Sequence, residues 1–209
     1  MIGVTIGIGR AYREMAELAA ESVRKWTGLD VDVITDAAGI RAAEVKLTLL
    51  ERYSGTVFYF DADTRMVNAW PELREYEGRE SFIASKHDAS EALDRDCEHY
   101  KLNPDRFFYA GLWIANRQHA AAFKHALELC QSDYYRTSFG VDQTALNVAM
   151  QRFDVDFQPL PWERHVVCAP ENLHKIPADA SVLHIAGAHL QGENRKIFER
   201  EILRRERCN

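Results

Sequence analysis

The sequence predicts an α/β fold in which helices cover both faces of a mainly parallel sheet. Segments with strand and helix character alternate through residues 1–63. Residues 57–60 form an apolar run without polar alternation, which is typical of a strand that is covered on both faces. The chain has 209 residues, of which 46% are hydrophobic, enough for one domain with a sizeable core. We therefore expect a single domain over residues 1–209, with a nucleotide-binding half at residues 1–63.

The first half should follow the strand–helix order of doubly wound folds. Apolar residues spaced i, i+3, i+4 and i+7 from Met15 to Trp26 indicate a helix after the first strand. Gly7 and Gly9 mark the tight turn between these two elements. The elements expected here are a strand at 2–8, the helix around Met15 to Trp26, a strand at 31–35, a helix at 42–53 and a strand at 56–60.

The second half should add strands and helices to the same sheet. Its expected strands lie at 81–85, 107–116, 155–157 and 182–185, and its expected helices at 118–130, 141–151 and 193–207. Trp113 lies within an apolar strand and should belong to the core. Residues 86–106 are polar, rich in charge and hard to assign to an element, and we expect a flexible segment or a lid there.

Two acids separated by one residue follow the apolar strand. Asp61 and Asp63 should lie at the carboxyl end of that strand, the edge at which open α/β sheets bind ligands. Two carboxylates brought together repel each other, and a divalent cation such as Mg²⁺ or Mn²⁺ removes that repulsion. The simpler alternative is a turn in which Asp63 or Thr64 caps the next segment. The apolar strand in front of the acids favours a metal site.

The sequence lacks three other motifs that bind nucleotides or phosphate groups. A phosphatase of the haloacid dehalogenase type also uses Asp-x-Asp after a strand, but it requires Thr two places after the second acid, where this chain has Arg65. A dinucleotide fingerprint beginning at Gly7 would need a third glycine, and that position is Tyr12. There is also no Walker sequence.

Composition restricts the possible partners. The formal net charge is -6, without a large basic block, so nucleic acid is not favoured as a partner. No run approaches the ~20 apolar residues of a membrane span, and the N-terminal residues lack a signal pattern. Four cysteines far apart support neither a zinc site nor a disulfide framework: Cys97, Cys130, Cys168 and Cys208. We expect a cytoplasmic protein.

Four motifs, taken together, resemble a known family. They are Phe60-Asp61-Ala62-Asp63, the stretch 107–116 with Tyr109-Ala110-Gly111, the stretch 141–147 with Asp142-Gln143, and the stretch 182–187 with His184 and Gly187. Their order and spacing resemble the glycosyltransferases of the GT-A fold. The greatest similarity is to glycosyltransferase family 8, the glycogenin and galactosyltransferase group. The resemblance covers nearly the whole chain and implies a GT-A fold, with residues 64–209 holding the donor sugar and the acceptor.

The resemblance implies a role for each matching residue. Asp61, Asp63 and His184 would bind Mn²⁺, or Mg²⁺, beneath the diphosphate of a nucleoside-diphosphate sugar, with UDP-sugar the family's usual donor. Asp142 and Gln143 would contact the donor sugar near its reacting carbon and would form the catalytic pair. The other residues that would contact the donor are Gly7, Ile8 and Tyr12 at the base and ribose, Lys46 over the sugar and phosphates, and Ala62, Tyr109, Ala110, Gly111, Gly187 and His189.

The chain departs from the family pattern at two motifs and is short for the family. Tyr109 stands where the family usually has Asn, which affects sugar specificity. The Lys of the family's final Lys-Pro-Trp is missing, and His189 is the candidate replacement. The function implied is a metal-dependent transfer of a sugar, with its anomeric configuration retained, to a small sugar, a glycan end or a modified side chain. The alternatives are a nucleotide-sugar-binding protein without transfer activity and, less favoured, a metal-dependent phosphatase.

Simpler structural roles compete with the functional ones. His184 lies in an apolar run, so it could be a hydrogen-bonded core residue. Asp142 could serve only as an acid in the first turn of its helix. Lys46 lies on a helix and is more simply a solvated residue. A solvated face is also expected for four basic residues of the last helix, Lys196, Arg200, Arg204 and Arg207.

Overall fold

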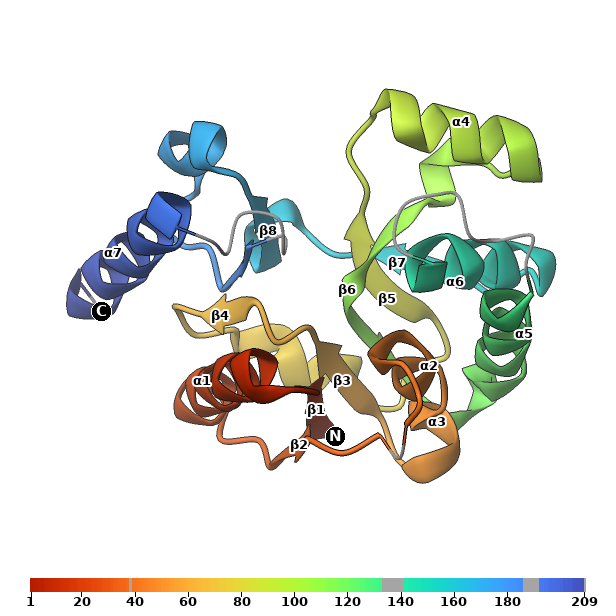
Figure 1. Cartoon of the computed structure of the whole chain (residues 1–209), viewed down its shortest axis with the longest axis horizontal. Helices are drawn as coiled ribbons and strands as arrows, with labels where there is room; N and C mark the ends of the chain where they lie inside the picture. Colours follow the sequence, from red (N-terminus) through yellow and green to blue (C-terminus); the bar gives the residue numbers. More distant parts are fainter. Residues whose placement is uncertain (38, 133–140, 186–191, 209) are drawn as a thin grey trace. The chain divides into compact units, whose positions relative to one another are not determined.

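A computed structural model of the chain describes residues 1–37, 39–132, 141–185 and 192–208. The strands are β1 (Ile2–Ile6), β2 (Val31–Ile34), β3 (Val57–Phe60), β4 (Thr64–Met66), β5 (Phe82–Lys86), β6 (Phe108–Ala115), β7 (Phe157–Pro159), β8 (His165–Cys168) and β9 (Val182–Ile185). The α-helices are α1 (Arg10–Thr27), α2 (Ala42–Leu47), α3 (Leu49–Arg52), α4 (Glu91–Tyr100), α5 (Ala120–Gln131), α6 (Val141–Arg152) and α7 (Gly192–Cys208) (Figure 1).

The strands form one principal sheet and one small sheet. The strand order of the principal sheet is β2-β1-β3-β6-β5-β7, and that of the small sheet is β4-β9-β8. In the principal sheet, β1 is parallel to β2 and β5 is parallel to β7, whereas β5 is antiparallel to β6. The sequence prediction of an α/β fold with helices around a mainly parallel sheet is therefore confirmed.

The chain divides into two compact units. The first unit contains Met1, Ala37–Tyr59 and Tyr76–Leu160, and so holds α2 to α6 with β5, β6 and β7. The second unit contains Ile2–Asp36, Phe60–Glu75 and Pro161–Asn209, and so holds α1, α7, β1, β2 and the small sheet. The boundary between the two units falls within β3, between Tyr59 and Phe60.

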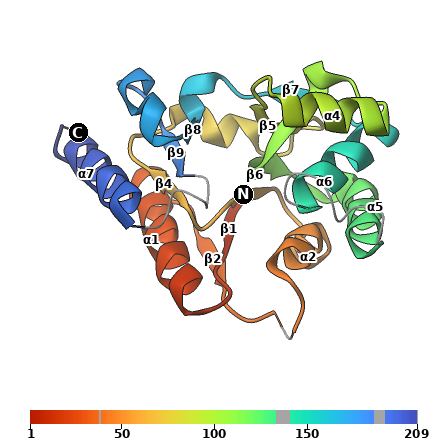
Figure 2. The ribbon, with the colours of Figure 1, turned by 45° about the horizontal axis from the view of Figure 1, so that its top comes forward.

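The core of the first unit is rich in aromatic rings. Trp113 of β6 is fully buried, as the sequence predicts, and its ring stacks on Tyr59 with centroids 5.0 Å apart. Phe123 of α5 meets Trp113 edge-on at 4.9 Å. In Figures 1 and 2, α5 lies beside α6, and both helices belong to this unit. A second apolar cluster joins α4 to α6 and includes Leu93, Cys97, Leu102, Phe107 and Val148.

The core of the second unit supports the small sheet. One apolar cluster combines residues of β8, β9 and α7, among them Val166, Leu183, Ile185 and Phe198. Helix α1 lies against β1, β2 and β4 (Figure 2). A smaller cluster of Met15, Ala16 and Ala62 packs α1 against the residues that follow β3. This packing fixes the turn that leads from β3 to β4.

Several element boundaries differ from the sequence prediction. The first strand ends at Ile6 rather than residue 8, because Gly9 takes a φ of 85° that turns the chain into α1. The helix expected at 42–53 is divided at Thr48, whose hydroxyl donates to the Val45 carbonyl at 2.9 Å. The strand expected at 155–157 is β7, Phe157–Pro159, and the short strands β4 and β8 were not predicted.

The segment 86–106, which was hard to assign from the sequence, contains a helix in its central part. Glu91–Tyr100 form α4, which begins at Ser90, whose hydroxyl accepts a hydrogen bond from the Leu93 amide at 3.2 Å. The helix ends at Lys101, which adopts a φ of 56°. The buried residues Leu93 and Cys97 are one helical turn apart and hold this polar helix to the core. Among the described residues, no helix combines the length and apolar character that crossing a membrane requires.

Gly7 permits close contact between β1 and α1, and this contact can be tested. A Cβ atom at Gly7 would lie 2.7 Å from the Ala16 Cβ and 2.8 Å from the Tyr12 carbonyl oxygen. We expect Gly7→Ala to lower the free energy of unfolding by ~1–3 kcal/mol through overpacking. Gly55→Ala is the matched control, because a Cβ there meets no atom within 4 Å. Urea unfolding should show a loss for Gly7→Ala alone; equal stability of the two variants would contradict the tight contact.

Candidate functional site

The turn between β3 and β4 carries the two acids predicted as metal ligands. The Asp61 carbonyl accepts hydrogen bonds from the amide of Thr64 at 3.1 Å and from its hydroxyl at 2.8 Å. Thr64 therefore closes the turn, as the alternative interpretation of this motif expected. The turn and the acids are compatible, since these bonds use backbone and hydroxyl groups and leave both carboxylates to point elsewhere.

Strand pairing brings His184 to the same turn. β4 and β9 are antiparallel, with Thr64 opposite His184. The amide of Ile185 donates to the Asp63 carbonyl at 3.0 Å, which extends the pairing to the residue before β4. Because β9 is the central strand of the small sheet, His184 has a strand on each side. The position of the imidazole beside the acids thus follows from backbone hydrogen bonding.

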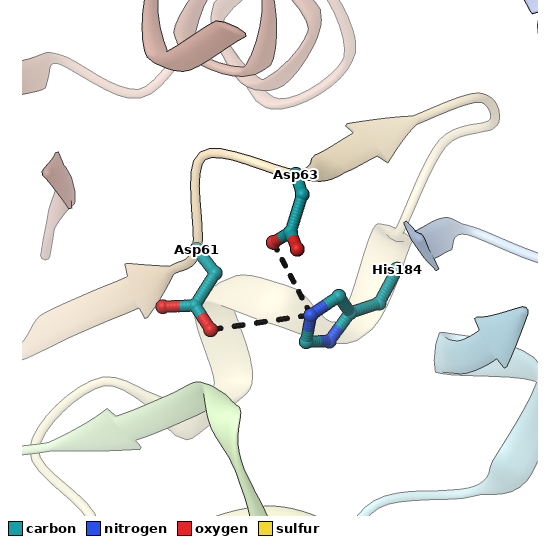
Figure 3. Close-up of side chains that lie close together, drawn as sticks. All are labelled: Asp61, Asp63 and His184. Carbon is teal, nitrogen blue, oxygen red and sulfur yellow. Dashed lines mark ion pairs between the residues drawn. The ribbon is translucent and has the colours of Figure 1, made fainter. Parts of the chain in front are cut away.

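The three side chains converge (Figure 3). The Nε2 atom of His184 lies 3.3 Å from Asp63 Oδ1 and 3.9 Å from Asp61 Oδ2. One ligand atom from each residue lies within 4.8 Å of the other two. Asp61 is partly exposed, whereas the His184 side chain is only 9% exposed. Carboxylates suit both Mn²⁺ and Mg²⁺, and Mn²⁺ also accepts an imidazole nitrogen. This set of ligands therefore fits a divalent cation.

A second imidazole lies behind His184 and was not predicted as part of the site. His165 of β8 is 2% exposed, and its Nε2 lies 3.1 Å from the Nδ1 of His184. Burial, with the neighbouring His184, lowers the pKa of His165 well below its ordinary value. The sequence offers one sign that His165 belongs near His184. His165 is followed by two valines, so it lies in an apolar run as His184 does.

Arg65 holds the turn from its other side. Its Nη1 donates to the carbonyls of Thr64 at 2.7 Å, Met15 at 3.2 Å and Ala62 at 3.3 Å. Burial lowers the pKa of Arg65 to about 10, so it remains charged at neutral pH. Arg65 occupies the place where a haloacid dehalogenase phosphatase requires Thr, and here its guanidinium ties the turn to α1.

Lys46 and Asp142 form a second cluster, within the first unit. The Nζ atom of Lys46 lies 2.7 Å from Asp142 Oδ2 and 3.3 Å from the Ala110 carbonyl oxygen. It also lies 4.8 Å from the centre of the Tyr59 ring, within range of a cation–π interaction. Lys46 is 5% exposed, so the expectation of a solvated lysine is wrong. Three successive residues of α2, Val45, Lys46 and Leu47, are buried, so this part of the helix is covered on more than one face.

Asp142 is ionised although only 19% of its side chain is exposed. Burial raises its pKa, but the charge and hydrogen bond of Lys46 outweigh that effect and lower the pKa below its ordinary value. The backbone amides of Asp142 and Gln143 also donate to the carboxylate and lower the pKa further. The carboxylate therefore does serve the first turn of α6, as the simpler interpretation expected, and it is also paired with a buried ammonium.

Asn147 joins the residues of the second and third motifs. Its side chain pairs with both backbone groups of Phe108, accepting from the amide and donating to the carbonyl at 2.9 Å each. It also donates to the Gln143 carbonyl at 2.9 Å. Gln143 in turn accepts from the Ala110 amide at 3.4 Å. This asparagine belongs to the third motif, yet sequence reasoning gave it no role; its spacing of four residues from Gln143 was the available signal.

Tyr109 stacks on a neighbouring ring. The His87 ring lies 4.0 Å away, and the tyrosine hydroxyl donates to Asp88 Oδ2 at 3.5 Å. Burial, with the charge of Asp88, raises the pKa of Tyr109 to about 12, so the hydroxyl stays protonated at neutral pH. Gly111 is buried in β6, next to Ala110.

The remaining residues expected at the donor are distributed as follows. Gly7 is buried at the end of β1, Ile8 is half-buried and Tyr12 is 54% exposed in the first turn of α1. Ala62 is buried in the turn against Met15 and Ala16. Gly187 and His189 lie outside the described residues. The basic residues expected on a solvated face of α7 are all exposed: Lys196, Arg200, Arg204 and Arg207.

Comparisons with known proteins support the fold. No protein-family model matches this chain, and no curated protein matches its sequence. Among solved structures, the galactosyltransferase LgtC in complex with donor and acceptor sugar analogs matches 99% of this chain and 95% of its own, with a TM-score of 0.68 and 14% identity. The glycosyltransferase GlyE of Streptococcus pneumoniae TIGR4 matches 97% of this chain and 60% of its own, with a TM-score of 0.67 and 14% identity.

A third match is the bifunctional glycosyltransferase WbbM without ligand. It covers 90% of this chain at a TM-score of 0.65 and 14% identity, and this chain spans 46% of the WbbM chain. Matches of this kind establish the fold. The chain has the α/β fold of glycosyltransferases, the GT-A fold that the family resemblance implies.

The buried ion pair between Lys46 and Asp142 should matter for stability. We expect Lys46→Met to lower the free energy of unfolding by ~2–4 kcal/mol at neutral pH, because it leaves a half-buried carboxylate without its partner. The double variant with Asp142→Asn should be more stable than Lys46→Met alone. Lys86→Met is the matched control, since its pair with Asp105 has the same 2.7 Å distance but is exposed, and it should change stability little.

The loss of stability in Lys46→Met should also depend on pH. Because the pKa of Asp142 is lowered on folding, the pair stabilises the protein above the unfolded pKa of ~3.9. That stabilisation disappears as the pH falls through the folded pKa. The cost of Lys46→Met, measured by urea unfolding, should therefore shrink below about pH 4. If Lys46→Met lowers the free energy of unfolding by the same amount at pH 7 and at the lowest pH at which the protein folds, the ion pair is contradicted.

Proposed function

We propose that this protein is a metal-dependent glycosyltransferase of the family 8 type, which uses a nucleoside-diphosphate sugar, a UDP-sugar, as donor. The observation that carries the proposal is the convergence of Asp61, Asp63 and His184 in a chain with the glycosyltransferase fold. The matched LgtC structure holds donor and acceptor sugar analogs, which supports a donor and an acceptor for this chain as well. The proposed cation is Mn²⁺ or Mg²⁺.

The three ligands would hold the cation through two carboxylates and one imidazole nitrogen. A divalent cation bound there would neutralise the negative charge that develops on the departing diphosphate. Arg65 and Thr64 keep the two acids on one turn, and the pairing of β4 with β9 keeps His184 beside them. This preorganisation places the negative charges together before any ligand arrives.

Asp142 and Gln143 are the proposed catalytic pair. The anomeric carbon of the donor sugar gains positive charge as its bond to the diphosphate breaks, and an ionised carboxylate can stabilise that charge. Lys46 keeps the Asp142 carboxylate ionised and limits its motion. We propose that Lys46 also approaches the donor, as the resemblance implies, and that its main role is to position the Asp142 carboxylate through their ion pair.

The other proposed donor contacts follow the motifs. Gly7, Ile8 and Tyr12 would meet the base and ribose, and Tyr12 is exposed enough to do so. Ala62, Tyr109, Ala110 and Gly111 would line the sugar and diphosphate, together with Gly187 and His189. We propose that the whole chain acts as one GT-A-like domain, with residues 1–63 at the nucleotide and residues 64–209 at the sugar and acceptor.

The acceptor is proposed to be a small sugar, a glycan end or a modified side chain, with the anomeric configuration retained and the cytoplasm as the compartment. The net charge of -6 argues against nucleic acid.

The second candidate function is a nucleotide-sugar-binding protein without transfer, favoured by Tyr109 in place of Asn and by its stacking on His87. Hydrolysis of UDP-sugars in the presence of Mn²⁺ separates the two. Release of phosphate from simple esters would instead favour a phosphatase.

UDP and the metal should bind together. Three protein ligands fill only part of the coordination sphere, so phosphate oxygens are needed to complete it. Calorimetry should show that Mn²⁺ strengthens UDP binding and that Asp63→Ala abolishes this gain. Asp179→Ala removes an exposed acid that is not one of the three proposed ligands and should keep the gain. Equal affinity for UDP with and without Mn²⁺ would refute the proposed function.

The charge of Asp142 should matter for turnover rather than for nucleotide binding. Asp142→Asn keeps the size and hydrogen-bonding reach of the side chain but removes the charge. We expect turnover to fall by ~10²-fold or more, while the affinity for UDP with Mn²⁺ barely changes. A thermal melt of the same variant is the control. A large drop in melting temperature with unchanged turnover at low temperature would leave Asp142 a structural residue of α6.

A further inference from the structure

The small sheet sets His165 and His184 side by side. β8 is parallel to β9, with Val167 opposite His184 and His165 opposite Val182. Side chains two residues apart on a strand share a face, so His165 lies on the same face as Val167 and His184. Diagonal neighbours on one face of a sheet are within reach of aromatic side chains. The contact between the two histidines therefore follows from the register of the strands.

The two rings are joined through specific nitrogens. His165 Nε2 lies 3.1 Å from His184 Nδ1, and the ring planes are inclined by 21° with centroids 5.2 Å apart. Both residues are buried, with 2% and 7% of their surface exposed. Two ring nitrogens at this separation form a hydrogen bond only if they share one hydrogen between them. The direction of that bond decides which nitrogen of His184 is left with a lone pair.

We propose that His165 is a positioning residue that accepts a hydrogen bond from His184 Nδ1 and so presents the lone pair of His184 Nε2 to the cation. This inference rests on the proposed function, in which His184 is a metal ligand. The Nε2 atom already faces Asp63 and Asp61 (Figure 3). An imidazole that binds a cation through Nε2 carries its hydrogen on Nδ1, and the partner of that Nδ1–H fixes the ring orientation.

The competing arrangement explains why a partner is needed. If His184 carried its hydrogen on Nε2, that hydrogen would point at Asp63 Oδ1, 3.3 Å away, and would block the lone pair. A buried Nδ1–H without an acceptor would favour this blocked form, because an unsatisfied donor is costly. With His165 Nε2 as acceptor, the metal-binding form keeps both its hydrogen bond and its orientation. His165 then carries its own hydrogen on Nδ1.

Two substitutions separate the hydrogen bond from packing. His165→Phe keeps an aromatic ring but removes the acceptor. His165→Gln removes the ring but places an amide oxygen at about the position of Nε2. His119→Phe is the matched control, since His119 is also buried, at 3% exposed, and bonds to the Glu80 carbonyl and the Asn116 amide in the first unit. Each protein is titrated with MnCl₂ in the presence of UDP, and with UDP alone.

The order of the metal affinities decides the proposal. We expect His165→Phe to weaken Mn²⁺ binding by ~10–100-fold, His165→Gln to weaken it less, and His119→Phe to leave it unchanged. UDP binding without metal should be equal in all four proteins. If His165 acts by packing alone, His165→Phe will bind Mn²⁺ as well as or better than His165→Gln, and the proposal fails while the proposed function stands. If the wild-type protein gains no UDP affinity from Mn²⁺, the proposed function fails and the inference fails with it.

A measurement on the wild-type protein covers the case in which a variant does not fold. Nitrogen-15 NMR of the protein with MgCl₂ and UDP reports which nitrogen of each histidine carries hydrogen. We expect hydrogen on Nδ1 in both His184 and His165, with scalar coupling across the hydrogen bond between His184 Nδ1 and His165 Nε2. Hydrogen on Nε2 of His165, or no coupling between these two nitrogens, would overturn the proposal.

Discussion

The pairing of β4 with β9 is the constraint on which the candidate metal site depends. Thr64 opposite His184, and the hydrogen bond from the Ile185 amide to the Asp63 carbonyl, join a turn in the first third of the chain to a strand near its end. A shift of one residue in this register would turn His184 to the other face of the sheet. The apolar cluster of β8, β9 and α7 opposes such a shift, because it buries Leu183 and Ile185 on the face opposite His184.

Most of the fold could be predicted from hydrophobic periodicity. The strand at 182–185 matches β9, and the helices expected at 118–130 and 141–151 match α5 and α6 to within two residues. The parts that were missed have weak local signals. β4 has three residues, and its pairing partner lies far away in the sequence. In α4, charged residues obscure the spacing of Leu93, Cys97 and Tyr100, which is the pattern of one buried helical face.

The residues of the candidate site could be predicted from the sequence, but the contacts between their side chains could not. The acids after an apolar strand pointed to a metal site, and the family resemblance named His184 as the third ligand. The structure brings these three side chains together. Contacts between side chains from separate elements could not be predicted, because they depend on tertiary packing. The pairing of Lys46 with Asp142 and the contact of His165 with His184 are both of this kind. A lysine on a short amphipathic helix gives no sign that an acid from α6 will meet it.

The ion pair between Lys46 and Asp142 also has an evolutionary consequence. Lys46 alone would be a buried, uncompensated charge and Asp142 alone a half-buried one, so a change at one position is costly while the other is kept. Replacement of both by uncharged residues avoids that cost, and the effects of the two changes are therefore not additive. Related chains should accordingly vary at positions 46 and 142 together, and a lineage that loses one charge should soon lose or move the other.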